Sequence, residues 1–361
     1  MSTAKSAPPP VEDIRWTSPW LLFAVIAATF VALFAVTVLL PHDPYVRYQQ
    51  LAKTIQFRSQ WVYERTALDK TPIDVAIVGN SRLGAGISSP QLRDALGREL
   101  GHPVHVANLS MPQEGRNIHF AIVKRLLEDH PEVKLIVLSA IEQMPRGGHP
   151  AFRDLADAKD VVAAPKLLNL DYANDIAVIP YRQISLFVQS LAPALFGHRT
   201  KLDPKSYGGS DFDTTTTFRL PDGKIVERDQ IVDEATLAAT AGARTRETRP
   251  PMLPKSLSSY EFVIEHHYTD EIARMARAKG VSIVFTYLPI YRNPKPASDV
   301  DYYQKIGPVL EPSFVAGDYR LYSDYAHLNV HGTRQVTEWL AKQIADLEKR
   351  GQIGPIGGTA K

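Results

Sequence analysis

One stretch near the N-terminus constrains the fold more than any other, because residues 19–40 (PWLLFAVIAATFVALFAVTVLL) contain no charged side chain. As a helix, a run of this length spans about 33 Å, which is enough to cross a hydrocarbon core of roughly 30 Å. A cleaved signal peptide has a shorter apolar core, of about 7–15 residues, that ends at a small-x-small site. This run is longer and ends at Leu39-Leu40-Pro41 without such a site. The sequence therefore predicts an uncleaved transmembrane anchor over residues 18–40.

The two flanks of this run differ in composition. Residues 1–17 hold Ala, Pro and Ser with few large apolar side chains, which predicts a disordered tail. Residues 41–71 carry aromatic and apolar residues at helical spacing, which predicts a helical linker between the bilayer and the main domain. Lys and Arg occur on both sides of the run, so the positive-inside rule does not decide the orientation of the anchor.

Composition excludes several classes of function. The chain of 361 residues has no cysteine, which removes disulfides, thiolate metal sites and a cysteine nucleophile. Its net charge of +2 gives no support for a nucleic-acid partner. The length suits one large domain or two.

Strand and helix patterns alternate along most of the chain, which favours an α/β fold with a parallel sheet covered on both sides. We expect this domain over residues 72–349, followed by a flexible tail over 350–361. Short apolar runs predict the strands, and segments with helical spacing predict the helices. The expected strands are 74–78, 105–109, 134–139 and 281–288, and the expected helices are 90–101, 115–130, 261–279 and 332–349.

The alternation breaks between residues 146 and 259, which we interpret as a mainly helical insertion. Residues 154–197 have helical and apolar character, and Pro221-Asp222-Gly223 predicts the turn of a hairpin. Insertions at the carboxyl edge of a sheet tend to shape a binding site. The alternative is an extra packed lobe without contact to substrate.

The first predicted strand ends in the turn Gly79-Asn80-Ser81. Ser81 therefore lies just past the carboxyl end of a strand, where open α/β sheets place their ligands. Taken alone, the turn is better explained as an ordinary strand end that holds a serine. It needs a base elsewhere in the chain before it predicts chemistry, because a serine hydroxyl is a weak nucleophile without one.

Asp324 and His327, three residues apart just before the last predicted helix, provide a candidate base and its partner. A carboxylate beside a histidine fixes the tautomer and stabilises the imidazolium that forms when the histidine takes a proton. His331 is a competing base, and its spacing from His327 also suits a metal pair. A third ligand at convincing spacing is missing, so no metal site is expected.

Together these two segments resemble the SGNH (GDSL-like) hydrolase superfamily. Gly79-Asn80-Ser81 is similar to its first block, with Asn in place of the commoner Asp. Asp324-x-x-His327, followed by Leu-Asn-x-x-Gly, is similar to its last block, and Thr286-Tyr287-Leu288-Pro289 is similar to the strand before it. The resemblance implies a three-layer α/β/α fold with Ser81 as nucleophile, His327 as base and Asp324 as its partner.

The chain departs from the superfamily in its oxyanion hole. Ser110 stands where the second block has a glycine, and the third-block Asn is missing from Ser139-Ala140-Ile141-Glu142. A backbone N–H survives the first change, so we expect the N–H groups of Ser81 and Ser110 to form the hole. Arg82 and Asn80, next to the nucleophile, are the candidate substrate-binding residues.

With its anchor, the chain resembles the membrane-anchored branch of the superfamily, which includes alginate O-acetylation proteins and the D-alanylation protein of teichoic acids. This resemblance implies an extracytoplasmic, periplasmic domain that acts as an O-acyltransferase or esterase on a polysaccharide or other envelope glycan. A multi-pass membrane O-acyltransferase is the implied partner, and no cofactor is expected. The missing third-block Asn leaves a second hypothesis open, a non-catalytic accessory subunit. A dinucleotide site is weakly supported, because Gly84-x-Gly86 lacks the third glycine.

Overall fold

The protein has an α/β fold built on a five-stranded parallel sheet in the order β2-β1-β3-β6-β7. The structure, a computed structural model, describes residues 18–140, 146–244, 252–292 and 299–357. The strands are β1 (Val75–Val78), β2 (Val106–Asn108), β3 (Leu135–Ser139), β6 (Ser282–Thr286) and β7 (Val309–Leu310). The predicted α/β class and parallel sheet are confirmed, and the short edge strand β7 was not predicted.

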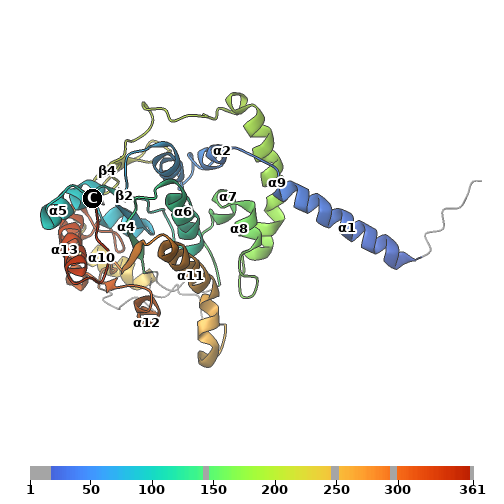
Figure 1. Cartoon of the computed structure of the whole chain (residues 1–361). Helices are drawn as coiled ribbons and strands as arrows, with labels where there is room; N and C mark the ends of the chain where they lie inside the picture. The colour runs from blue at the N-terminus through green and yellow to red at the C-terminus, as the bar shows by residue number, and fades with distance from the viewer. Residues whose placement is uncertain (1–17, 141–145, 245–251, 293–298, 358–361) are drawn as a thin grey trace, which may run out of the picture.

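Each face of the sheet packs into its own apolar core, because the strands are apolar on both sides. Ala76 and Val78 of β1 point into one core cluster, which also holds apolar side chains of α6 and α11. Val75 and Ile77 point into the other cluster, with side chains of α5 and α13. These helices are α5 (Ser89–Leu100), α6 (Arg116–Asp129), α11 (Val263–Ala278) and α13 (Val330–Lys349) (Figure 1).

The strand order determines where a ligand site is expected. β1 has β2 on one side and β3 on the other, so the chain passes over β1 on its way from β2 to β3. In doubly wound sheets, ligands bind at such a switch point, outside the carboxyl ends of the strands. The turn that carries Ser81 directly follows β1 and therefore lies at this point.

The N-terminal helix α1 (Pro19–Val38) projects away from the rest of the protein (Figure 1). It is long and apolar enough to cross a membrane, and none of its residues is buried. A signal sequence near the N-terminus can meet the same criteria of length and hydropathy. Pro19 occupies the first helical position, where a backbone N–H would have no partner within the helix.

Two predicted flanking segments are in fact part of the core. The expected linker forms α2 (Pro44–Gln49), α3 (Arg58–Tyr63) and a π-helical turn (Glu64–Leu68), and its aromatic side chains join the core beside α6. The expected flexible tail was wrong for residues 350–357, because Ile353 and Ile356 are buried in the other core cluster. The helical character of residues 41–71 agrees with the prediction, but helical spacing does not show that these helices pack into the core, and the irregular segment 350–357 gives no periodic signal.

The insertion combines helices with the predicted hairpin, which the antiparallel strands β4 (Thr217–Arg219) and β5 (Ile225–Glu227) confirm. Its helices in the described residues are α7 (Phe152–Leu155), α8 (Ala158–Val162), α9 (Tyr172–Leu191) and α10 (Glu234–Arg244), with a 3₁₀ turn at Pro193–Phe196.

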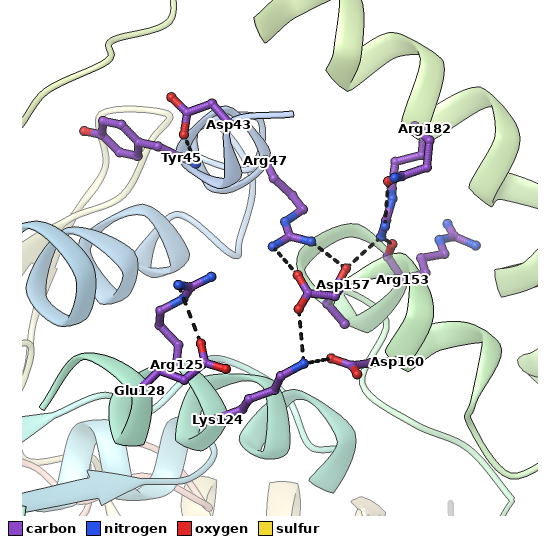
Figure 2. A network of polar contacts seen from close by, with 12 residues as sticks. Asp43, Tyr45, Arg47, Lys124, Arg125, Glu128, Arg153, Asp157, Asp160 and Arg182 are labelled. Atoms are coloured by element: carbon purple, nitrogen blue, oxygen red, sulfur yellow. Dashed lines mark hydrogen bonds and ion pairs between the residues drawn. The ribbon is translucent and has the colours of Figure 1, made fainter. Parts of the chain in front are cut away.

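A charged network joins the insertion to the segment that follows α1 (Figure 2). Asp157 accepts from the buried Arg47 at 3.0 Å and from Lys124 of α6 at 3.1 Å. Burial alone raises the pKa of Asp157, but Arg47 and Lys124 outweigh this effect and hold the pKa well below its usual value. Asp157 is therefore ionised at neutral pH and ties α2, α6 and α8 together.

Candidate active site

The turn that carries Ser81 is shaped by its two neighbours. Ser81 is the first residue of α4 (Ser81–Gly86), and the Asn80 side chain caps this helix by accepting from the N–H of Arg82 at 3.0 Å. A Cβ atom at Gly79 would lie 2.7 Å from Cδ2 of Leu83 and 3.0 Å from Cβ of Ser139. A side chain at this position would require Leu83 and Ser139 to shift, so glycine lets the turn pass close to β3.

Ser81, His327 and Asp324 form one chain of hydrogen bonds. The Ser81 hydroxyl donates to Nε2 of His327 at 2.8 Å. Nδ1–H of His327 donates to the Asp324 carboxylate, at 2.8 Å to Oδ2 and 2.9 Å to Oδ1. Because Nδ1 keeps its proton and donates it in a hydrogen bond to Asp324, Nε2 is left as an acceptor that faces the hydroxyl. This arrangement can remove the Ser81 proton as the oxygen attacks an electrophile.

Asp324 is held in its ionised form. Burial acts to raise the pKa of Asp324, but the hydrogen bond and charge of His327, with the N–H groups of Ala326 and His327, hold this pKa below its usual value. The two N–H groups donate to Oδ1 at 2.8 and 2.9 Å. The carboxylate is thus oriented by its own loop and remains an acceptor for the imidazole.

The loop of His327 is closed at its base by Asn329. This fully buried side chain caps α13 by accepting from the N–H groups of His331 and Gly332, and it donates to the carbonyl of Arg320 at 2.8 Å. A Cβ atom at Gly332 would lie 2.3 Å from the carbonyl oxygen of Leu321. These contacts give the Leu-Asn-x-x-Gly sequence a structural reason, since they fix where the loop enters the helix.

His331, the competing base, lies on the first turn of α13 and is exposed. The Ser81 hydroxyl donates its hydrogen bond to His327. Within the residues that the structure describes, no group of three or more His, Asp or Glu side chains is placed to hold a metal ion.

The predicted oxyanion donors differ in their surroundings. The first N–H groups of a helix have no intrahelical partner, so the N–H of Ser81 is available at the start of α4. The N–H of Ser110 instead donates to Oδ1 of Asn108 at 3.1 Å, and Ser110 is buried. The N–H of Ser110 can bind an oxyanion only if it gives up its hydrogen bond to Asn108. Its role in the oxyanion hole therefore stays a prediction. Ile141 and Glu142, where the third-block Asn is missing, lie outside the described residues.

Arg82 and Asn80, the predicted substrate contacts, are turned into the protein. The buried Arg82 donates to the carbonyl of Leu288 at 3.1 Å and to Glu114 at 3.4 Å, and it lies 5.3 Å from the ring centre of Tyr287. The Asn80 amide also donates to Glu114 at 3.4 Å. Both side chains hold the serine turn in place, and substrate binding by either one stays a prediction.

Arg228, which follows the insertion hairpin, reaches the histidine loop and was not predicted. It donates to Oγ of Ser323 and to the carbonyl of Thr214, both at 3.2 Å. Burial lowers the pKa of Arg228, while the negative charge of Asp324 opposes this effect. This contact favours the interpretation that the insertion shapes the site over that of a separate lobe. Sequence offers no signal for it, because the contact joins distant segments.

Asn108 and Arg58 are two further residues that sequence reasoning missed. The Asn108 amide donates to the carbonyls of Leu83 and Ile87, at 3.1 and 2.8 Å, and so holds the end of α4. Arg58 donates to the carbonyl of Asn108 at 2.8 Å and to Thr214 at 2.7 Å, and burial lowers its pKa to about 10. Arg58 therefore links the segment after α1, the serine turn and the insertion.

The sequence comparisons with known proteins assign no family to this chain, so its function is inferred from the geometry of the site. No protein-family model matches the chain, and there is no significant match among the curated proteins.

Proposed function

We propose that the protein is a serine esterase or O-acyltransferase of the SGNH type, held at a membrane by α1. The observation that carries the proposal is the 2.8 Å hydrogen bond between Oγ of Ser81 and Nε2 of His327, with Asp324 on Nδ1. The strand order and the core cluster on each side of the sheet support a three-layer α/β/α arrangement. The position of Ser81 at the switch point supports the same assignment.

The reaction takes place in two acyl-transfer steps. Oγ of Ser81 attacks the acyl carbonyl while Nε2 of His327 takes its proton, and Asp324 stabilises the imidazolium. The tetrahedral intermediate places its oxyanion near the N–H of Ser81. His327 then gives the proton to the leaving alcohol, which leaves an acyl ester on Ser81. In the second step, His327 removes a proton from water or from a sugar hydroxyl, whose oxygen attacks the ester carbonyl. As the bond between the acyl carbon and Oγ of Ser81 breaks, His327 returns the proton to Oγ and the serine is regenerated.

We place this activity on the extracytoplasmic, periplasmic side of the membrane, with an exported polysaccharide or envelope glycan as substrate. Support comes from the exposed apolar helix α1 and from the resemblance to the anchored branch of the superfamily. A multi-pass membrane O-acyltransferase is the proposed partner that supplies acyl groups. An adjacent gene for such a protein would favour transfer over hydrolysis.

A fluorophosphonate probe tests the nucleophile, because it forms a covalent bond with an activated serine. We expect the wild-type chain to be labelled and Ser81→Ala to lose both labelling and ester turnover. Ser313→Ala is the matched control, since this exposed serine lies outside the hydrogen-bonded chain of Ser81, His327 and Asp324. Unchanged labelling of Ser81→Ala contradicts the proposal.

A non-catalytic accessory subunit is the second candidate, favoured by the Ser110 N–H that is already bonded to Asn108. Such a subunit binds glycan or holds the acyltransferase partner without using Ser81. It predicts that Ser81→Ala fully complements a deletion strain. Failure to complement at a normal protein level excludes this alternative.

A further inference from the structure

Helix α9 carries an exposed apolar stripe that the proposed reaction does not use. Its members recur at intervals of three and four residues, which places them on one face of a helix. The exposed fractions range from 46% to 84% for Tyr181, Ile184, Val188, Leu191 and, in the following 3₁₀ turn, Leu195. The opposite face of α9 is buried through Ile179 and Leu186. Large apolar side chains aligned in this way on a surface mark an interaction site.

The stripe lies where α1 leaves the protein. Figure 1 shows α9 running across the C-terminal end of α1, along the side of the domain from which α1 projects. Nε2 of Gln183 donates to the carbonyl of Val38 at 3.3 Å, and Oγ of Ser190 accepts from the N–H of Asp43 at 2.9 Å. Bonds near the middle and the end of α9 therefore fix it to the last residue of α1 and to the segment that follows.

We propose that α9 and its 3₁₀ turn form an interfacial helix, with the stripe seated at the boundary between headgroups and acyl chains of the bilayer that α1 crosses. The inference rests on the proposed anchor. If α1 spans the membrane, a helix across its end lies along the bilayer surface. Amphipathic helices bind there with their apolar face about 5–10 Å deep. The exposed Leu167 and Leu170, just before α9, add apolar area.

A lipid surface explains this face better than a second protein does, because the anchor alone brings the stripe to the membrane. The other face of α9 is bonded to the domain, since Arg182 donates to the carbonyl of Ala156, next to the network around Asp157 (Figure 2). Seating the stripe in the bilayer therefore fixes how the whole domain, including the Ser81 site, is oriented over the membrane.

Site-specific fluorescence tests the inference, and the chain has no cysteine to remove first. The full chain is labelled with an environment-sensitive dye at Val188→Cys, in the stripe. Val31→Cys, exposed in α1, reports on the anchor, and Lys342→Cys, exposed on α13, reports on the domain surface. Each protein is reconstituted into phosphatidylcholine vesicles with nitroxide lipids, whose quencher sits either near the headgroup or near the chain end.

For the Val188 label we expect roughly half or more of the fluorescence to be lost to the quencher near the headgroup, as the depth of interfacial helices implies. The Val31 label should be quenched more by the deeper nitroxide, and the Lys342 label by neither. Adding Ile184→Glu and Leu191→Glu should release the Val188 label from the bilayer and abolish its quenching, while the Val31 label stays quenched. This result supports the interfacial helix.

The labels also separate the possible failures. Quenching at Val31 without quenching at Val188 leaves the anchor standing and overturns the interfacial helix. Absence of quenching at Val31 overturns the anchor and the interfacial helix together, without bearing on Ser81. A Val188 label shielded in native membranes but unquenched in pure lipid assigns the stripe to a protein partner, and it also overturns the inference.

Discussion

The turn that carries Ser81 and the loop that carries His327 are held in different ways. On the serine side, Asn80 and Arg82 are 2% and 5% exposed and are locked between the ends of the sheet strands. On the histidine side, the side chains of His327 and Asp324 are 24% and 46% exposed. The nucleophile is therefore positioned by the core, whereas the base is positioned by its own loop and by Arg228 of the insertion. Changes on the first side should affect folding, and changes on the second should affect rate.

The largest effect is expected from His327→Ala. Loss of the base should lower ester turnover by at least about 10⁴-fold, because a serine without its histidine is barely nucleophilic. The midpoint of thermal unfolding should hardly move, since the side chain is partly exposed. Turnover of a chromogenic acetyl ester and thermal unfolding measure the two effects. His331→Ala, at an exposed neighbouring position, should keep full activity, and an equal loss in both variants would refute the assignment of the base.

Arg82→Ala is expected to act mainly on stability. It leaves the carbonyl of Leu288 and the Glu114 carboxylate without a buried cation, which should cost about 3 kcal/mol in the free energy of unfolding. Chemical denaturation measures this loss. The matched control is Arg320→Ala, whose guanidinium is largely exposed and should change stability by no more than about 0.5 kcal/mol. An Arg82→Ala protein with the same free energy of unfolding as wild type would mean that the serine turn is not held by the core.

Arg228→Gln should lower kcat/KM by about tenfold, equivalent to about 1.4 kcal/mol, through loss of a charged hydrogen bond to the histidine loop. Removing a cation near Asp324 also makes protonation of the Asp324–His327 pair easier. The acidic limb of the kcat/KM profile should therefore move to higher pH. Arg228→Lys, which keeps the charge, should restore the position of that limb. A reduced rate with an unmoved profile would assign Arg228 a packing role only.

The smallest effect concerns Asp324 and the pH dependence of stability. Because the folded protein holds the pKa of Asp324 below its unfolded value, the stabilisation is complete above about pH 4 and fades as pH falls through the folded pKa. Asp324→Asn should therefore lose less than about 1 kcal/mol of unfolding free energy at neutral pH, given the partial exposure of the carboxylate. The difference from wild type should shrink in acid. A gap that widens in acid would contradict the lowered pKa.

Features with a local sequence pattern could be predicted, whereas contacts between distant segments could not. Strands such as Val75–Val78 are short apolar runs, and helices such as Val330–Lys349 have a periodic apolar pattern. The segments that carry Ser81, Asp324 and His327 combine particular residue types at short spacing. Arg58 and Arg228 escaped prediction because their partners are backbone carbonyls and hydroxyls on distant segments. Tyr45 and Ile356 were misplaced because neither the short helix α2 nor the irregular C-terminal segment shows in its sequence pattern that it packs into a core.

Trapping the acyl group on the protein tests the central claim most directly. The full chain is mixed with an activated acetyl ester, quenched rapidly in acid, digested and analysed by mass spectrometry. We predict one acetyl group on the peptide that contains Ser81, absent in Ser81→Ala and formed far more slowly in His327→Ala. An acetyl group on a different serine, or equal acetylation in all three proteins, would contradict the assignment of Ser81 as the nucleophile.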